Sequence, residues 1–249
     1  MINKSQLKVT NLSLNIGGIK ILKDISFSMG QGNIIGLVGP NGAGKTTLIN
    51  CVTCFENRFQ GDIYYNGESI KGIPPNILPK YGIVRTFQNL GLFTELSVKD
   101  NLLIASHIKF ESNILRMFHN EKIVEKEIIE LLNQESISPE RLVQDLSYGQ
   151  QKIVEFLCAL IQRPKVLVLD EPAAGLSAKE KDRMIKMIQI KQKELGFSLL
   201  VIEHDANFVS QLCESVIVLR SGEFLIQGKP EAVFKDKEVI KAWIGESDV

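Results

Sequence analysis

The chain has 249 residues, of which 44% are hydrophobic and 23% charged, and its formal net charge is zero. These values are typical of a folded protein that buries a sizeable core. A neutral chain lacks the global basic field that holds proteins on nucleic acid or on an anionic membrane surface. No apolar run approaches the roughly 18–20 residues that cross a bilayer, and the first residues lack the apolar stretch of a secretion signal. We therefore expect a cytoplasmic protein that reaches a membrane only through a partner.

Antiparallel strands are expected early in the chain. The first roughly 30 residues and the segment "GDIYYNGESI" (61–70) combine short strand patterns with turns. Buried strands are expected further on, because three runs are almost continuously apolar. They are "NIIGLVG" (33–39), "KVLVLDE" (165–171) and "SLLVIEH" (198–204). Helical patterns near 45–55, 148–161 and 178–195 alternate with these strands, so the sequence predicts an α/β fold with a parallel sheet.

Residues of about 89–160 interrupt this alternation. Helical periodicity without a convincing strand runs through "VKDNLLIASH" (98–107), "EKIVEKEIIELLNQ" (121–134) and "QQKIVEFLCALIQ" (150–162). This pattern predicts a helical subdomain inserted between two strands of the sheet. We expect a single domain, 1–249, with a core and antiparallel part at about 1–88 and 162–249, and the helical subdomain at about 89–161.

A glycine-rich loop follows the first buried strand. "GPNGAGKTT" (39–47) matches the Walker A or P-loop pattern G-x-x-x-x-G-K-[ST] in the strand–loop–helix context that this motif requires. Its glycines allow successive backbone N–H groups to surround phosphates, and the next helix contributes its N-terminal dipole. Lys45 would supply charge to the terminal phosphates, and Thr46 a hydroxyl to Mg²⁺. The motif predicts nucleotide binding, although kinases, GTPases and many ATPases share it.

Acidic and basic side chains follow two other buried strands. Asp170, at the mouth of the sheet, would hold Mg²⁺ through a coordinated water. Glu171 is expected to point elsewhere because strand side chains alternate, and it would polarise the water that attacks the γ-phosphate. His204 would bind the γ-phosphate and sense its loss. The alternative interpretations are a solvated turn for the acids and an ordinary surface position for the histidine.

The cysteines are Cys51, Cys54, Cys158 and Cys213. The first two form a C-x-x-C pattern, which can indicate zinc or redox chemistry. No second Cys/His pair completes a four-ligand zinc site, and the segment reads as a helix of core residues. We therefore expect buried thiols.

The phrase "LSYGQQ" (146–151) opens an amphipathic helix roughly 20 residues before the Asp-Glu strand. Ser147 and the N–H groups of the helix start would form a second anion site. This loop resembles the signature of ATP-binding cassette (ABC) proteins, and the resemblance extends over the whole chain to about residue 245. It implies an ABC-type ATPase with a P-loop NTPase (RecA-like) core, in which two cassettes pair head to tail and each signature closes on the other's ATP. It also implies that Gln88 is the Q-loop residue reaching Mg²⁺ and the attacking water, and that His204 is the switch histidine.

Within that family the chain most resembles the ATPase subunits of branched-chain amino-acid importers. The resemblance is carried by "RTFQN", "LFTELSVKDNLL", "LSYGQQ", "DEPAAGL", "IEHD" and "KEVIKAWIGE", and the alternative is that these phrases are common to all cassettes. Two positions depart from the general family pattern. Ile16 stands where an aromatic ring usually stacks on adenine, which implies weaker base recognition. Ser177 stands at the D-loop position where Asp is usual, which puts communication between the two sites through this residue in doubt.

A partner surface is expected directly after Gln88. The segment 89–98 carries Leu90, Leu92, Phe93 and Leu96, and in the family this region receives a coupling helix of the membrane subunit. Packing within the helical subdomain is the alternative. The tail "EVIKAWIGE" (238–246) is amphipathic, with Val239, Ile240 and Trp243 on one side, and is expected to pack on the domain.

These observations predict the ATP-hydrolysing subunit of an ABC importer for branched-chain or related amino acids, which binds ATP and Mg²⁺ on the cytoplasmic face of the cell (inner) membrane. The expected partners are a second ATP-binding subunit (identical or a paralogue), transmembrane permeases and, indirectly, an extracytoplasmic solute-binding protein, without nucleic acid. The alternatives are another cargo such as urea or lipopolysaccharide, a soluble cassette of DNA repair or translation, and a non-hydrolytic binding module. The expected catalytic residues are Glu171, His204 and Gln88; the nucleotide ligands are Gly39, Pro40, Asn41, Gly42, Ala43, Gly44, Lys45, Thr46, Thr47, Ser147, Gly149 and Gln150; and the metal ligands are Thr46, Gln88 and Asp170.

Overall fold

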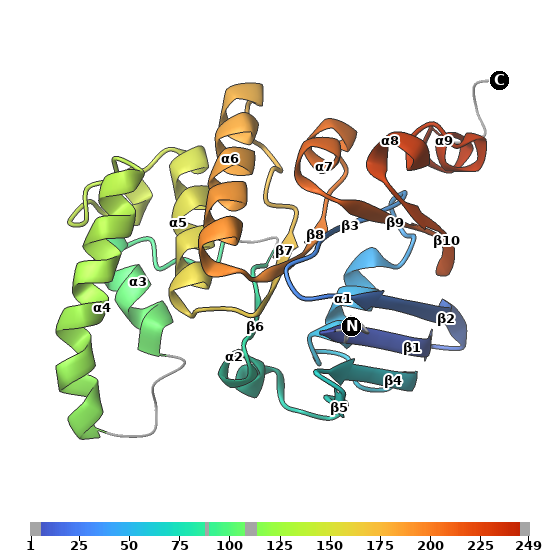
Figure 1. The fold of residues 1–249 in the computed structure, drawn as a ribbon, viewed down its shortest axis with the longest axis horizontal. Coiled ribbons are helices and arrows are strands. Elements are labelled where there is room, and N and C mark those ends of the chain that lie inside the picture. The colour runs from blue at the N-terminus through green and yellow to red at the C-terminus, as the bar shows by residue number, and fades with distance from the viewer. Residues whose placement is uncertain (1–5, 88–89, 108–113, 245–249) are drawn as a thin grey trace.

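A computed structural model describes residues 6–87, 90–107 and 114–244, which contain a six-stranded sheet (Figure 1). The strand order is β10-β9-β3-β8-β7-β6. Neighbouring strands from β9 to β6 pair in parallel, whereas β10 pairs antiparallel to β9 at one edge. These strands are β3 (Ile34–Val38), β6 (Ile83–Arg85), β7 (Val166–Asp170), β8 (Ser198–Ile202), β9 (Ser215–Arg220) and β10 (Glu223–Gly228).

An antiparallel sheet of order β2-β1-β4-β5 lies beside this parallel sheet. Its strands are β1 (Leu7–Ile16), β2 (Ile19–Met29), β4 (Gln60–Tyr65) and β5 (Glu68–Ser69). β1 and β2 are longer than the short strands predicted from the sequence. The register of β1 shifts between Val9 and Leu12, around Asn11, whose φ is 49°. Such bulges interrupt the two-residue alternation by which a strand is recognised in a sequence.

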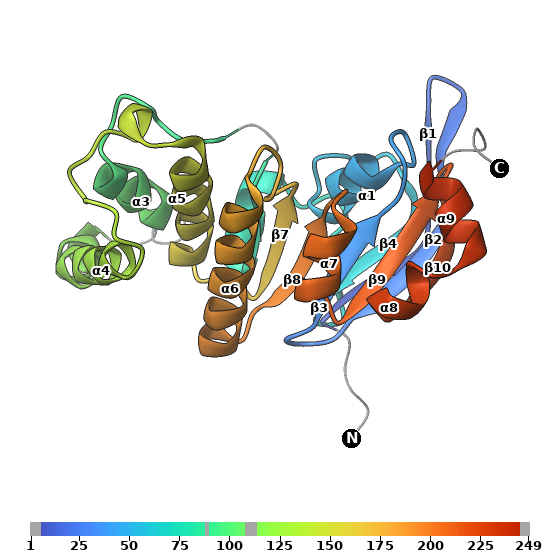
Figure 2. The same ribbon diagram turned by 90° about the horizontal axis from the view of Figure 1, so that it is seen from above.

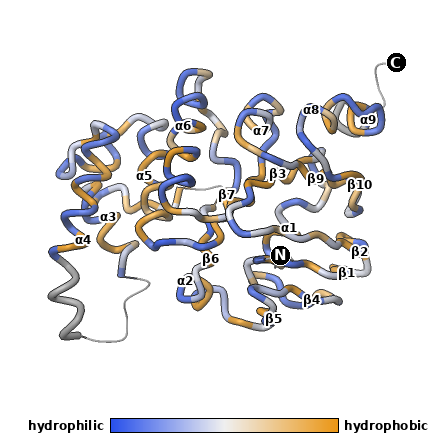
Figure 3. The backbone as a smooth tube through the Cα atoms, viewed as in Figure 1, coloured by the Kyte–Doolittle hydropathy of each residue, from blue (hydrophilic) through white to orange (hydrophobic). Residues whose placement is uncertain are grey.

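The central strands are buried on both faces, and alternate residues enter two different cores. In β3, Ile34 and Val38 contribute to one core and Ile35 and Leu37 to the other. The first core includes residues of α5, α6 and α7, and the second includes residues of β1, β2 and α1. The hydrophobic colour accordingly follows β3 and β9 in Figure 3, whereas α6 carries both hydrophobic and hydrophilic colours along its length.

Helices cover the two faces of the sheet, as seen in Figures 1 and 2. α6 and α7 lie on one face, and α1 lies on the other with the antiparallel sheet. α3, α4 and α5 lie at the end of the molecule beyond β6, where α3 contacts both α4 and α5. The helices are α1 (Lys45–Val52), α2 (Leu78–Tyr81), α3 (Val98–His107), α4 (Ile114–Gln134), α5 (Tyr148–Ile161), α6 (Ala178–Leu195), α7 (Ala206–Leu212), α8 (Pro230–Val233) and α9 (Lys237–Ile244), with short 3-10 turns at Pro75–Ile77 and Val143–Asp145.

The predicted α/β fold with its antiparallel part is confirmed. The helical patterns at 98–107, 121–134 and 150–162 correspond to α3, the second part of α4 and α5, all between β6 and β7. The subdomain limits at about 88/89 and 161/162 stay a prediction. Among the described residues, no helix combines the length and the apolar character that a membrane crossing requires.

The tail prediction was wrong for one residue. Val239 of α9 is buried as expected, but the side chain of Ile240 is 41% exposed. Consecutive residues of an α-helix are about 100° apart, and here the core covers Val239 almost completely but Ile240 only in part. The side chain of Trp243 lies outside the described residues.

A glycine in β3 determines how closely α7 approaches the sheet. A methyl group at Gly36 would lie 2.9 Å from Val209 Cγ1 and 3.2 Å from Cys213 Sγ, both in or next to α7. We predict that Gly36→Ala lowers the free energy of unfolding by about 1–3 kcal/mol through overpacking. Gly91→Ala is the control, because a methyl group there meets nothing within 4 Å. It should change stability by less than about 0.5 kcal/mol. Urea denaturation measures both, and equal stability of the two variants would contradict the packing argument.

Candidate nucleotide site

The glycine-rich loop joins β3 to α1 in a backbone conformation that requires its glycines. Gly39 has a φ of 149°, and a Cβ there would lie 2.2 Å from the carbonyl oxygen of Leu219. Gly44, with a φ of 97°, is the N-cap residue of α1, and no side chain caps the helix. The first N–H groups of α1 are therefore free of a side-chain acceptor and suit an anion. Pro40, Asn41, Gly42 and Ala43 complete the loop, and Thr46 and Thr47 lie in the first turn of α1.

Lys45 is buried at the start of α1. Its Nζ donates to the carbonyl oxygens of Gly39 at 2.8 Å and Pro40 at 2.9 Å, both in the same loop. Burial lowers the pKa of Lys45 below its ordinary value, and the negative charges of Glu171 and Asp170 oppose this shift. The ammonium group therefore lies in a site where further negative charge would stabilise it.

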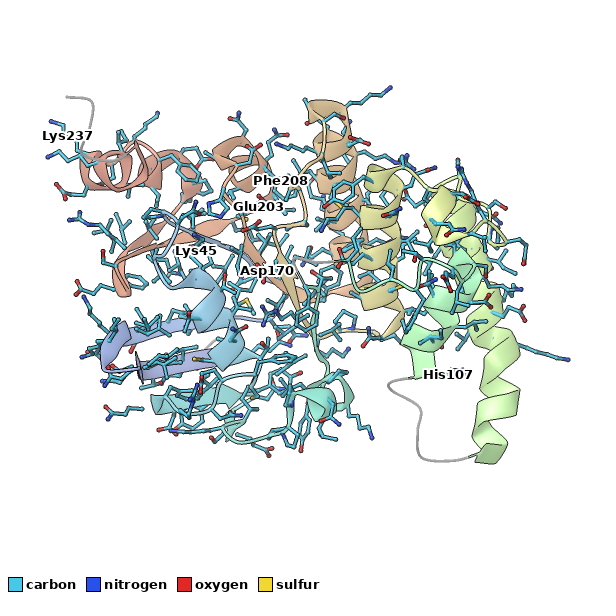
Figure 4. All side chains as sticks on the ribbon, turned by 180° about the vertical axis from the view of Figure 1, so that it is seen from behind. Lys45, His107, Asp170, Glu203, Phe208 and Lys237 are labelled. Atoms are coloured by element: carbon cyan, nitrogen blue, oxygen red, sulfur yellow. The ribbon has the colours of Figure 1, made fainter. Side chains whose placement is uncertain are left out.

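Parallel pairing brings the predicted residues to one edge of the sheet. β8 lies between β3 and β7, and Ile202 of β8 pairs with Leu37 of β3 and with Asp170 of β7. The residues after these strand ends are consequently neighbours in space. Figure 4 shows Lys45, Asp170 and Glu203 near the centre of the molecule, while His107 and Lys237 lie at opposite ends.

Asp170 is the last residue of β7. Its side chain is only 5% exposed, and its Oδ2 accepts a hydrogen bond of 2.9 Å from Nη2 of Arg85, the last residue of β6. The backbone N–H of Asp170 donates to Thr86 Oγ1 at 3.4 Å. Sequence reasoning gave Arg85 no role. The available signal was an arginine at the end of a short buried strand, because a buried charge requires a partner.

Glu171 follows β7 with a φ of 52°. The direction of its side chain is therefore set by a left-handed turn residue, and the predicted explanation from strand alternation was wrong. Its Oε1 lies 3.2 Å from Nε2 of His204. Non-glycine residues in this backbone region cluster at functional sites. The acid and the histidine thus meet at the edge of the sheet, just beyond the ends of the adjacent strands β7 and β8.

Glu203 was missed as a site residue, although it interrupts an apolar run. It is buried, its Oε1 accepts a hydrogen bond from Ala173 N at 2.7 Å, and its Oε2 accepts one from His204 N at 3.1 Å. Burial raises the pKa of this carboxyl above its ordinary value, and the backbone hydrogen bonds oppose that shift. Glu203 thereby joins the turn that carries Glu171 to the turn that carries His204.

The start of α5 lies against the start of α6. Ser147 is the N-cap of α5, where its Oγ accepts from Gln150 N at 3.2 Å and its N–H donates to Gln150 Oε1 at 3.1 Å. A Cβ at Gly149 would lie 2.2 Å from Glu180 Oε1, and one at Gly175 would lie 2.9 Å from the ring of Tyr148. In Figures 1 and 2, β7 lies between α5 and α1, so the structure does not bring the signature residues together with Lys45.

Three further sequence predictions have different outcomes. Gln88 lies outside the described residues. Ile16 ends β1 with 42% of its surface exposed, and the weaker base recognition expected there stays a prediction. Ser177 is the N-cap of α6, where it forms a capping box with Glu180. An aspartate can also act as an N-cap, so the local fold does not depend on serine at this position.

Three of the cysteines, Cys51, Cys54 and Cys213, are buried as expected, and Cys158 is half-buried. Cys51, Cys54, Cys158 and Cys213 are all free. Burial raises the pKa of Cys51 to about 12 and that of Cys54 to about 11, and it also raises the pKa of Cys158 and Cys213. Within the part of the chain that is described, no group of three or more His, Cys, Asp or Glu side chains is arranged to hold a metal ion.

The phosphate loop at a helix start and the acids at the end of a second parallel strand of the same sheet define the class of P-loop nucleoside triphosphatases. Comparison with known proteins narrows the class. Residues 22–174 match the family described as ABC transporter. The high-affinity branched-chain amino acid transport ATP-binding protein BraF of Pseudomonas aeruginosa is 35% identical, over 97% of this chain and 98% of its own length. LivG of Escherichia coli, with the same description, is 31% identical over 97% and 98%.

A solved structure of similar sequence has the same fold. It is the ADP conformation of an ATP-binding cassette of an ABC transporter, with 31% identity and a TM-score of 0.85, over 97% of this chain and 99% of that one. The chain belongs to the ABC transporter family, and it is an ATP-binding, ATP-hydrolysing cassette. The resemblance inferred from the sequence is confirmed.

The raised thiol pKa values predict low reactivity in the folded protein. At about pH 7.5 we expect the native cysteines to react with iodoacetamide about a hundredfold or more slowly than free cysteine, because so little thiolate forms. All four should react at once in concentrated guanidinium chloride, which serves as the internal control. Mass spectrometry counts the modified thiols. Rapid modification of Cys51 and Cys54 in the native protein would instead support a redox or metal role for that pair.

Proposed function

We propose that this chain energises the uptake of branched-chain or related amino acids, as the ATP-hydrolysing subunit of an ABC importer with partner permeases. The observation that carries the proposal is the near full-length similarity to BraF and LivG, whose names describe them as branched-chain amino acid transport ATP-binding proteins. The chain also carries the phosphate loop, the Asp170–Glu171 pair and the signature phrase, although Ile16 and Ser177 depart from the general family pattern. The cargo itself would contact the permeases and a solute-binding protein rather than this subunit.

The loop between β3 and α1 fits the phosphates of ATP. The uncapped start of α1 offers N–H groups, and Lys45 is a buried cation whose present acceptors are two loop carbonyls. Phosphate oxygens would exchange with these carbonyls and return the desolvated ammonium group to a strongly negative partner. Residues 39–47 are thus the proposed phosphate ligands.

The same edge of the sheet fits Mg²⁺ bound to ATP. Thr46 has an exposed side chain in the first turn of α1, and Asp170 has a carboxylate at the end of β7. Mg²⁺ is usually held by one or two protein oxygens together with waters and substrate phosphates, so a cluster of several acids is not needed. We propose Thr46, Asp170 and Gln88 as its protein ligands, direct or through water. When bound, the ion neutralises charge that develops on the phosphates.

Glu171 is the proposed base for the attacking water. Its carboxylate lies at the same edge of the sheet as Lys45 and is oriented by His204 at 3.2 Å. The hydrogen bonds of Glu203 hold the turns that carry both residues. Glu171 would accept a proton from the water, and His204 would bind the γ-phosphate and lose this contact when the phosphate leaves.

A second cassette would complete each site. The signature residues Ser147, Gly149 and Gln150 lie at the start of α5, on the far side of β7 from α1. Ser147 is exposed there and its Oγ already caps α5, so the helix start is formed before any nucleotide arrives. Head-to-tail pairing would place this helix start on the partner's γ-phosphate. The partner is an identical chain or a paralogue.

The proposed permease surface lies between α3, α5 and the segment after Gln88. A cavity of about 270 Å³ is lined there by residues that include Phe87, Leu92, Phe93, Ile104 and Glu155. Phe93 is 55% exposed and Leu96 is also exposed, whereas Leu92 packs against the core. A cavity with exposed apolar rims suits a short amphipathic helix. Docking at this surface would hold the cassette on the cytoplasmic face of the cell membrane.

Glu171→Gln tests the hydrolytic assignment. The variant keeps the shape of the side chain but loses its basicity, so we expect near-total loss of ATP turnover while ATP still binds and the dimer persists longer. Glu130→Gln on α4, whose side chain is 63% exposed, should turn over ATP at the normal rate. Phosphate release measures ATP turnover, a binding assay measures ATP affinity, and gel filtration measures how long the dimer persists. Normal turnover in Glu171→Gln would refute the role of this residue as base.

The transport assignment is tested by co-purification with the permease subunits encoded by neighbouring genes. We expect a complex whose ATPase activity in liposomes rises several-fold with leucine, isoleucine or valine and the solute-binding protein. Phe93→Asp should abolish co-purification while ATP binding by the isolated cassette is unchanged. Stimulation by urea or by lipopolysaccharide instead would show that one of these is the cargo. A cassette that binds no permease would favour a soluble ABC ATPase.

A further inference from the structure

Arg85 connects two elements of the nucleotide site that are far apart in the sequence. It is the last residue of β6 and lies in register with Val168 of β7. Its guanidinium is 7% exposed and makes an ion pair of 2.9 Å with Asp170, whose side chain is 5% exposed. Further hydrogen bonds help to offset the cost of removing such a charged pair from water.

Two further hydrogen bonds reach α1, the helix that begins at Lys45, and its C-cap Thr53, whereas Nε of Arg85 has no hydrogen-bond partner among the described residues. Nη1 of Arg85 donates to Asn50 Oδ1 at 2.7 Å and to Thr53 Oγ1 at 3.1 Å. The two ends of the guanidinium therefore bind different elements. Nη2 binds the end of β7, and Nη1 binds the helix that follows the phosphate loop. A planar guanidinium has a fixed angle between its donors, so it fixes the orientation of both partners.

Two aromatic rings also lie close to the guanidinium. Its central carbon lies 5.0 Å from the ring centre of Phe87 and 5.7 Å from that of Phe55. The two rings meet edge to face at 5.4 Å. Cation–π contacts of this kind restrict the position of the charge without competing for its N–H groups. The arginine is thus held by contacts to β7, to α1 and to both rings.

We propose that Arg85 is a positioning residue of the nucleotide site, which orients the Asp170 carboxylate toward the Mg²⁺-bound water and fixes it relative to α1. The inference rests on the proposed function, in which Asp170 serves the metal. Because Arg85 engages Oδ2 of Asp170, Oδ1 is the oxygen that would serve the metal's water. Groups that orient a metal ligand in this way typically change metal affinity by about 10–100-fold when they are replaced.

Positioning can be separated from charge by Arg85→Lys. Lysine keeps the positive charge beside Asp170, but its single ammonium nitrogen cannot reproduce the fork between Asp170 and α1. If only the charge matters, the lysine variant should resemble the original protein. If orientation matters, Mg²⁺ should contribute less to nucleotide binding.

The measurement is the ratio of ADP dissociation constants in EDTA and in Mg²⁺, by isothermal titration calorimetry. This ratio is the gain in ADP affinity from Mg²⁺, and a general loss of stability cancels from it. We expect Arg85→Lys to lower the ratio by about tenfold. Arg58→Lys is the matched control, because Arg58 makes a similar fork to Glu56 at 2.6 Å but is largely exposed. Its ratio should be unchanged.

Asn50→Ala removes the shorter contact to α1 and leaves the Arg85–Asp170 pair intact. It should lower the same ratio by about threefold, the effect of one hydrogen bond. A ratio within twofold of the original in folded Arg85→Lys overturns the proposal. If that variant does not fold, an unchanged ratio in Asn50→Ala overturns it.

Asp170→Asn distinguishes this inference from the proposed function. One outcome is that Mg²⁺ no longer improves ADP affinity in Asp170→Asn but still improves it fully in Arg85→Lys. That outcome refutes only the positioning role of Arg85. An unchanged gain in Asp170→Asn refutes the metal role of Asp170, and the inference about Arg85 with it.

Discussion

The parallel pairing of β3, β8 and β7 is the constraint on which the nucleotide site depends. Parallel strands end at the same edge of a sheet, and Ile202 pairs with both Leu37 and Asp170. The phosphate loop, the acids and the histidine therefore meet although more than a hundred residues separate the first from the others. The alternation of strand residues between two cores supports this arrangement, because both faces of the sheet must be covered for the strands to be so apolar.

Buried polar groups hold the loops at that edge. Lys45 binds the carbonyls of its own loop, Glu203 accepts from two turns, and the Arg85–Asp170 pair reaches to α1. Each of these groups is costly to bury alone and is stabilised by specific partners. The consequence is a site whose backbone is fixed before nucleotide binds, which reduces the ordering that ATP has to impose.

In the proposed dimer, one cassette carries only half of each site. The signature residues at the start of α5 lie beyond β7 from the phosphate loop, and the close approach of Gly149 to Glu180 and of Gly175 to Tyr148 ties them to α6. In the proposed dimer, movement of α3 to α5 under a permease would carry the signature toward or away from the partner's ATP. Hydrolysis would then be coupled to transport through geometry, since no residue of this subunit need touch the cargo.

The sequence by itself determined the fold class, the phosphate loop and the family, because apolar runs, glycines before a Lys-Thr pair and the signature phrase are local patterns. It also placed α3 and α5 closely, since their helical periodicity is uninterrupted. The tertiary structure decided what depends on distant contacts: the extent of the bulged strand β1, the turn conformation of Glu171, the exposure of Ile240 and the roles of Arg85 and Glu203. The partners of Arg85 and Glu203 could not be predicted from the sequence, for a physical reason. A buried charge is defined by its partners, and those partners are brought to it only when the sheet is assembled.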